Sequence, residues 1–154
     1  MTLGALVDLG QIVAAIATLA SVLYLAVQIR QNSRLLKEEA ARSTLETTYR
    51  INLLMVERAE IADLAMRGAG ETGRLDPIDY FRLHMLWMTV FLSYQDAYLH
   101  ASRSLIERHL WQVHEGHMLQ FLARPGLAKW WGQNRSRFAA EFADHVDERR
   151  AASP

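Results

Sequence analysis

The sequence predicts an all-α protein in which an N-terminal transmembrane helix continues into a small cytoplasmic helical bundle. Three observations predict this fold class. A long uncharged apolar segment lies near the N-terminus, apolar residues further along recur at helical spacing, and no segment alternates apolar with polar residues as a half-buried strand does. We divide the chain into a membrane anchor over residues 1–29 and a helical domain over residues 30–154.

The composition limits the classes of protein to which the chain can belong. It has 154 residues with 17 basic and 17 acidic side chains, which is the size of one modest domain without net charge. Balanced charge argues against nucleic acid as a partner. The sequence has no cysteine, which excludes disulfides and thiol catalysis. Its only lysines are Lys37 and Lys129 and it is rich in Ala, which indicates a GC-rich bacterial genome.

Residues 9–29 form the segment that we expect to cross a membrane. They contain no Asp, Glu, Lys or Arg, and at about 1.5 Å per residue they match the hydrocarbon thickness of a bilayer. The first basic residues, Arg30, Arg34 and Lys37, all follow the segment. The positive-inside rule then predicts a single-pass protein of the bacterial inner membrane, with its N-terminus outside and its C-terminal domain in the cytoplasm. The alternative is a core helix of a soluble bundle.

One face of this segment carries only small or uncharged polar residues: Gly10, Gln11, Ala14, Thr18 and Ser21. Small residues at this spacing let helix backbones approach closely in lipid. We therefore expect the lipid bilayer as one partner and a second copy of the chain as another, giving a homo-oligomer. The alternative is that small residues are simply common in membrane helices.

The same helix is expected to continue to about residue 58, because neither Pro nor Gly occurs between Arg30 and Gly68. The apolar residues of its second half recur at helical spacing and are expected to contact a partner helix: Leu45, Tyr49, Leu53 and Val56. Residues 59–67 predict a short helix, and residues 68–75 predict a loop.

The predicted loop contains Gly68, Gly70 and Gly73, which spell the dinucleotide-binding pattern G-x-G-x-x-G. That pattern binds phosphate where a strand delivers the glycines to the N-terminus of a helix. Here a predicted helix precedes the glycines, so we interpret them as a connection between helices and expect no nucleotide cofactor.

Asp76 and Pro77 predict the start of a long helix, as N-cap and first helical residue, that ends near Leu99. This helix is apolar on most sides, which is typical of the central helix of a bundle. Its Met and aromatic residues suggest a pocket for a lipid or another apolar ligand, with plain core packing as the alternative. These residues are Met85, Trp87, Met88 and Phe91.

Three further helices complete the predicted bundle. The first begins at Ser104 or a neighbour and ends near Ala123, with four residues expected to point inward: Ile106, Leu110, Val113 and Phe121. The second covers residues 125–138 and begins at Pro125. The last covers the amphipathic stretch that contains Phe142 and Val146.

Four histidines lie between His100 and His117 and raise the question of a metal site. His114 and His117 project from the same side of a helix, and His109 is the nearest third ligand. The region has neither H-E-x-x-H nor paired Glu-x-x-His motifs. We therefore predict no metal and no cofactor, and keep a metal-dependent enzyme as the alternative.

The densest aromatic and basic cluster lies near the C-terminus: Trp130, Trp131, Arg135, Phe138 and Phe142. Trp and Arg dominate the energetically important residues of protein interfaces, so one interpretation is a docking surface. The other is that the aromatic residues close the hydrophobic core while Arg135 pairs with an acid.

Two sequence stretches carry a resemblance to a family. V-Q-I-R-Q-N-S-R over residues 27–34 and P-G-x-x-x-W-W-x-x-x-R-x-x-F-x-x-x-F over residues 125–142 resemble a family of small bacterial proteins, a domain of unknown function. The resemblance implies one N-terminal membrane helix and a helical cytoplasmic domain, and it brings no catalytic residue. We expect a membrane-anchored, self-associating interaction or scaffold protein that presents its helical domain to an unknown protein partner and has no catalytic activity.

Overall fold

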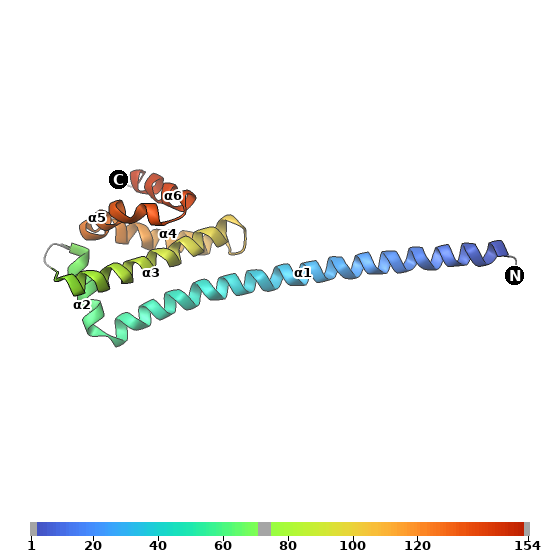
Figure 1. Ribbon diagram of the computed structural model, residues 1–154, viewed down its shortest axis with the longest axis horizontal. Helices are drawn as coiled ribbons and strands as arrows, with labels where there is room; N and C mark the ends of the chain where they lie inside the picture. Colours follow the sequence, from blue (N-terminus) through green and yellow to red (C-terminus); the bar gives the residue numbers. More distant parts are fainter. Residues whose placement is uncertain (1–2, 71–74, 153–154) are drawn as a thin grey trace. The chain divides into compact units, whose positions relative to one another are not determined.

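The computed structural model describes residues 3–70 and 75–152. Helices cover almost all of these two ranges and no strand occurs in them, so the predicted all-α fold class is confirmed. Figure 1 shows the helices coloured in chain order. The chain divides into two compact units, Met1–Glu39 and Ala40–Pro154, and helix α1 (Leu3–Glu57) contributes to both.

The first unit is the N-terminal part of α1. From Gly10 onwards its most apolar stretch has a mean hydropathy of 2.2, and none of that stretch is buried. Every side chain from Gly10 to Glu39 is exposed. A helix of this length and composition can cross a bilayer.

The predicted continuation of α1 beyond the apolar segment is confirmed, because the helix ends only at Glu57. Helix α2 (Ala59–Gly70) follows almost at once. The prediction of a loop from Gly68 is wrong, since Gly68 and Gly70 both belong to α2, while Gly73 lies outside the described residues. Gly68 is buried, and a Cβ there would collide with the Leu83 side chain. Packing against the next helix therefore overrides the low helix propensity of glycine.

In the second unit, the face of α1 that packs is not the predicted one. Leu45, Tyr49 and Val56 are 54%, 65% and 82% exposed. The buried positions are Ala40 and Thr44 instead, and the Thr44 hydroxyl donates to the Ala40 carbonyl at 3.0 Å. Small side chains let this part of α1 approach its neighbours, whereas the larger apolar residues lie on the opposite side.

Helix α3 (Pro77–Ser102) begins as predicted. The Asp76 carboxylate accepts hydrogen bonds from the backbone N–H groups of Ile78 and Asp79 at 2.8 and 2.9 Å. One face of α3 is buried: Leu83, Trp87, Phe91, Tyr94 and Ala97. The opposite face is apolar and exposed, which differs from the predicted central position: Ile78, Phe81, Met85 and Leu92.

Helix α4 (Arg108–Leu122) begins later than predicted. Ser104 has a φ of 57°, in the left-handed region, so it belongs to the connection and cannot open a helix. The inward residues of α4 are Trp111, His114, Glu115, Met118 and Leu122. Val113 and Phe121, which were expected inside, are 54% and 43% exposed because the helix presents a different side to the core.

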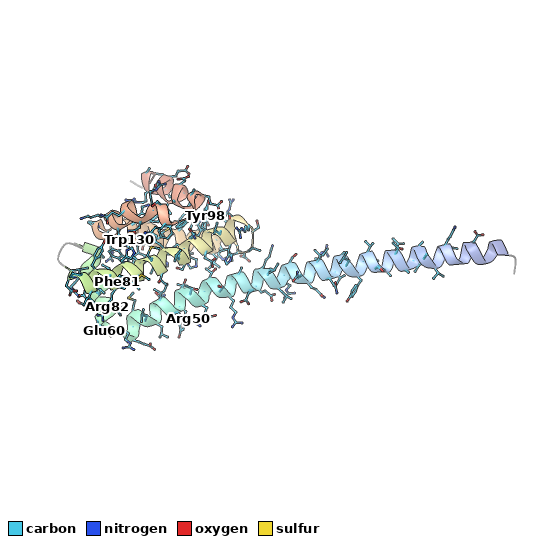
Figure 2. All side chains as sticks on the ribbon, in the orientation of Figure 1. Arg50, Glu60, Phe81, Arg82, Tyr98 and Trp130 are labelled. Carbon is cyan, nitrogen blue, oxygen red and sulfur yellow. The ribbon has the colours of Figure 1, made fainter. Side chains whose placement is uncertain are left out.

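Helix α5 (Pro125–Asn134), the short 3-10 helix η2 (Arg135–Arg137) and helix α6 (Ala140–Ala151) complete the second unit. Their aromatic residues meet α3 at Phe91, whose ring centroid lies 5.3 Å from those of Trp130 and Trp131. Trp130 lies among the helices of this unit in Figure 2, and its Nε1–H donates to His84 Nδ1 at 3.0 Å. The core is therefore an aromatic cluster between α3, α5 and α6.

Candidate functional site

A cavity of about 580 Å³ lies between helices of the second unit. This volume is in the range of small-molecule sites. Five helices line it. Helix α1 contributes Thr48, Ile51, Asn52 and Met55, and α2 contributes Ala62, Ala65, Met66 and Ala69. Helix α3 contributes Leu86, Trp87, Val90, Ser93 and Tyr94, α4 contributes His114, His117, Gln120 and Phe121, α5 contributes Leu127, and Arg124 lines the cavity from the connection between α4 and α5. Most of these side chains are apolar.

The cavity exists because one wall carries very small side chains. Ala62, Ala65 and Ala69 recur along one side of α2 and all line the cavity. A methyl group at each position leaves space that a Leu or Phe would fill. The opposite wall holds larger groups, including the Trp87 ring, which is 4% exposed.

Two polar side chains line this mainly apolar space and form no hydrogen bond to another residue that the structure describes. Tyr94 and His114 are each 7% exposed, and their ring centroids lie 6.4 Å apart. Within residues 3–70 and 75–152, neither side chain has a hydrogen bond to another residue. Because both side chains line the cavity, their polar groups are available to a water molecule or a ligand there.

Burial also fixes the charge of this pair. Removal from water raises the pKa of the Tyr94 hydroxyl, which therefore stays protonated. Burial, together with the nearby His117, lowers the pKa of His114 from its ordinary value of 6.5. At neutral pH this end of the cavity is therefore uncharged and offers hydrogen bonds only.

The protonation of His114 should make the stability of the protein depend on pH. Because its pKa is lower in the folded chain, the unfolded chain takes up a proton first as the pH falls below about 6.5, and this removes stability. We expect the urea concentration at the unfolding midpoint to decrease as the pH is lowered from about 6.5. In a His114→Gln variant this decrease should be smaller. The exposed His109 supplies a matched control, His109→Gln. An unchanged pH dependence in His114→Gln would contradict the assignment.

The other end of the cavity carries the one permanent charge among the described lining residues. Arg124 lies between α4 and α5, and its Nη1 is 3.9 Å from the Met66 sulfur. Met sulfur is a weak acceptor. No Asp or Glu lines the cavity, and among the described residues Arg124 forms no ion pair. His117, which is exposed, lies on the same side of α4 between Arg124 and His114.

The histidines considered for a metal do not gather. His109 is exposed and lies 3.0 Å from Glu107, whereas His114 and His117 face the cavity. His100 lies 3.4 Å from the Thr44 hydroxyl. In the part of the chain that the structure describes, no group of three His, Cys, Asp or Glu side chains is placed to hold a metal ion.

The predicted C-terminal cluster lies inside the domain. Its four aromatic members are all at most 7% exposed: Trp130, Trp131, Phe138 and Phe142. Arg135 pairs with Asp144 at 2.9 Å and with Asp147 at 2.8 Å. Asp147 also accepts the Trp131 Nε1–H at 2.8 Å. The cluster thus forms core and a polar edge that joins α5 to α6.

Of the residues suggested for an apolar ligand, only Trp87 lines the cavity. Phe91 is fully buried in the aromatic core, and Met85 is 49% exposed on the other side of α3. The Met and aromatic pattern therefore pointed to a helix that lines the cavity, but to only one of its lining residues. The residues that the sequence did not single out are the three alanines of α2, together with Tyr94 and Arg124.

A second buried polar group is Glu115 on α4. Its carboxylate lies 2.6 Å from His145 Nε2 and 3.2 Å from Arg149 Nε, both on α6. The His145 ring also packs against Tyr98, with centroids 4.9 Å apart. This network holds α6 on α4 and is separate from the cavity lining.

The small residues of the apolar segment, Gly10, Gln11, Ala14, Thr18 and Ser21, are exposed in the first unit. The Thr18 hydroxyl donates to the Ala14 carbonyl at 2.9 Å, and the Ser21 hydroxyl donates to the Ala17 carbonyl at 2.8 Å. Both hydroxyl groups therefore donate their hydrogen bonds within the helix, so that neither Thr18 nor Ser21 has an unsatisfied donor on this face.

Comparison with protein families, with curated proteins and with solved structures finds no match to the chain.

Proposed function

We propose that the protein is a membrane-anchored helical binding protein, without catalytic activity of its own, that holds a small and mainly apolar molecule in the cavity of its second unit. The observation that carries the proposal is a mainly apolar cavity of about 580 Å³ that is lined by Tyr94 and His114, two polar side chains that form no hydrogen bond to another described residue. Few polar groups in an apolar pocket are the usual composition of a ligand site.

The anchor in this proposal is residues 9–29 of α1. Its support is the length and the mean hydropathy of 2.2 of the exposed apolar stretch. The basic residues Arg30, Arg34 and Lys37 follow the stretch, which favours the bacterial inner membrane with the helical domain on the cytoplasmic side.

The test uses the full-length protein. It should first resist carbonate extraction from membranes. Bromododecanol should then quench the fluorescence of Trp87 at one molecule per chain, because bromine quenches a tryptophan that it contacts and Trp87 lines the cavity. A Trp87→Phe variant should lose that component of the quenching.

Filling the cavity should abolish binding. Ala65→Phe places a ring in the cavity, whereas Ala59→Phe, at the exposed start of the same helix, is the matched control. We expect saturable quenching in the control and none in Ala65→Phe. Equal quenching in both variants would overturn the proposal, and a chain extracted by carbonate would overturn its membrane part.

We also propose that copies of the protein associate through the small-residue face, as a scaffold that gathers several helical domains for a protein partner. The support is that Gly10, Ala14 and Thr18 form an exposed row on which helix backbones can pack closely. Leucine at all three positions should lower the oligomer mass in detergent, while leucine at the larger Val13 and Val22 should not. An unchanged mass in the first variant would contradict association through this face.

A further inference from the structure

The charged side chains that line the cavity indicate the charge of its ligand. Among the described residues that line the cavity, Arg124 has the only permanent charge, and none of them is acidic. The Arg124 side chain is exposed at the edge of the apolar cavity, and its guanidinium can form charge-assisted hydrogen bonds with an anion.

The other arginines nearby differ from Arg124 in their partners. Arg67 pairs with Asp63 at 2.8 Å and with Asp79 at 3.0 Å. Arg135 pairs with two aspartates in the same way. Arg124 instead contacts the Met66 sulfur, which lies 3.9 Å from its Nη1. It is therefore the arginine of the cavity that retains its capacity to bind a carboxylate or phosphate.

The two ends of the cavity are chemically distinct. Tyr94 and His114 lie at one end and offer hydrogen bonds without charge, so they do not favour an anion. His114 lies eight residues before Leu122, the last residue of α4, which corresponds to about 12 Å of helix rise, and Arg124 follows that end of the helix. The apolar surface between them is formed by residues such as Trp87, Val90 and Phe121.

We propose, resting on the function proposed above, that the ligand is an elongated amphiphile whose anionic group binds Arg124 and whose apolar body extends along α4 towards Tyr94 and His114. The anionic group is a carboxylate or a phosphate, which share the geometry that a guanidinium recognises. His117, one turn after His114 on the same side of α4, adds a further polar group between the two ends.

The test compares three molecules that differ only in the head group: bromododecanoate, bromododecyl phosphate and bromododecanol. Quenching of Trp87 in the full-length protein reports the Kd of each. We expect the anions to bind at least about tenfold more tightly than the alcohol, because a charge-assisted hydrogen bond exceeds a neutral one by that order. The tighter of the two anions identifies the head group.

An Arg124→Gln variant should remove the advantage of the anions and leave the Kd of bromododecanol unchanged. Arg108→Gln, at the exposed start of α4, is the matched control and should behave as wild type. The inference would be overturned if the wild type bound the alcohol and the anions with equal affinity. It would also be overturned if Arg124→Gln weakened the binding of all three molecules equally. In both cases the cavity would still be a binding site. Absence of quenching by all three would overturn the proposed function as well.

Discussion

Replacing Trp131 with alanine is expected to lower the free energy of unfolding by about 3–5 kcal/mol, the usual cost of removing a large buried aromatic side chain. Trp131 is 1% exposed. Its ring lies 5.1 Å from Phe138 and 6.0 Å from Phe142, and its Nε1–H donates to Asp147 at 2.8 Å. Alanine would leave a cavity between α3, α5 and α6 and remove that hydrogen bond.

Urea unfolding of the full-length protein, followed by circular dichroism, measures this loss. Trp131→Phe is an intermediate case, since it keeps an aromatic ring at this position but removes the donor to Asp147 and part of the indole volume. We expect it to cost roughly 1–2 kcal/mol. Gln133→Ala, exposed on the same helix, controls for helix propensity. A loss below about 1 kcal/mol in Trp131→Ala would contradict the assignment of this cluster to the core.

Local signals explain how much of the fold the sequence could predict. Asp76 followed by Pro77 predicted the start of α3 because a cap depends only on neighbouring residues. The uninterrupted run without Gly or Pro predicted that α1 continues to Glu57. The end of α2 was placed too early because Gly68 is held in the helix by its contact with Leu83, which no local pattern reveals.

The rotation of a helix about its own axis was harder to predict than its existence. In α4 the choice between Val113 and His114 as the inward position depends on what faces the helix, and the ring of Tyr94 on α3 faces His114. In α1 the alanine and threonine side packs, although the leucine side is more apolar. Periodicity alone favours the more apolar side in both cases.

The cavity could not be predicted at all from the sequence. A cavity results from what is small or missing between several helices, and the residues that create it, Ala62, Ala65 and Ala69, are ordinary helix formers. Arg124 is likewise inconspicuous in the sequence, because it differs from Arg67 and Arg135 only in forming no ion pair with another described residue of the fold.

Gly126 should tolerate no side chain, although it lies in a helix where alanine is normally the better residue. A Cβ at this position would collide with the backbone carbonyl oxygen of Gly68 and would lie 3.0 Å from that of Ala69. Both oxygens belong to α2, so α5 would have to move away from α2 as a whole. We expect Gly126→Ala to cost about 1–3 kcal/mol, as overpacking in a core does.

Gly132 provides the matched control in the same helix. A Cβ there would meet nothing within 4 Å, and the residue is exposed, so Gly132→Ala should raise the free energy of unfolding by up to about 1 kcal/mol through helix propensity. The two substitutions are chemically identical. Opposite changes in the free energy of unfolding would therefore report the contact between α2 and α5. A stabilising Gly126→Ala would mean that these helices do not cross as closely as Gly68 and Gly126 allow. Because Ala69 and Leu127 lie at this crossing and also line the cavity, Gly126→Ala should weaken binding of bromododecanol as well.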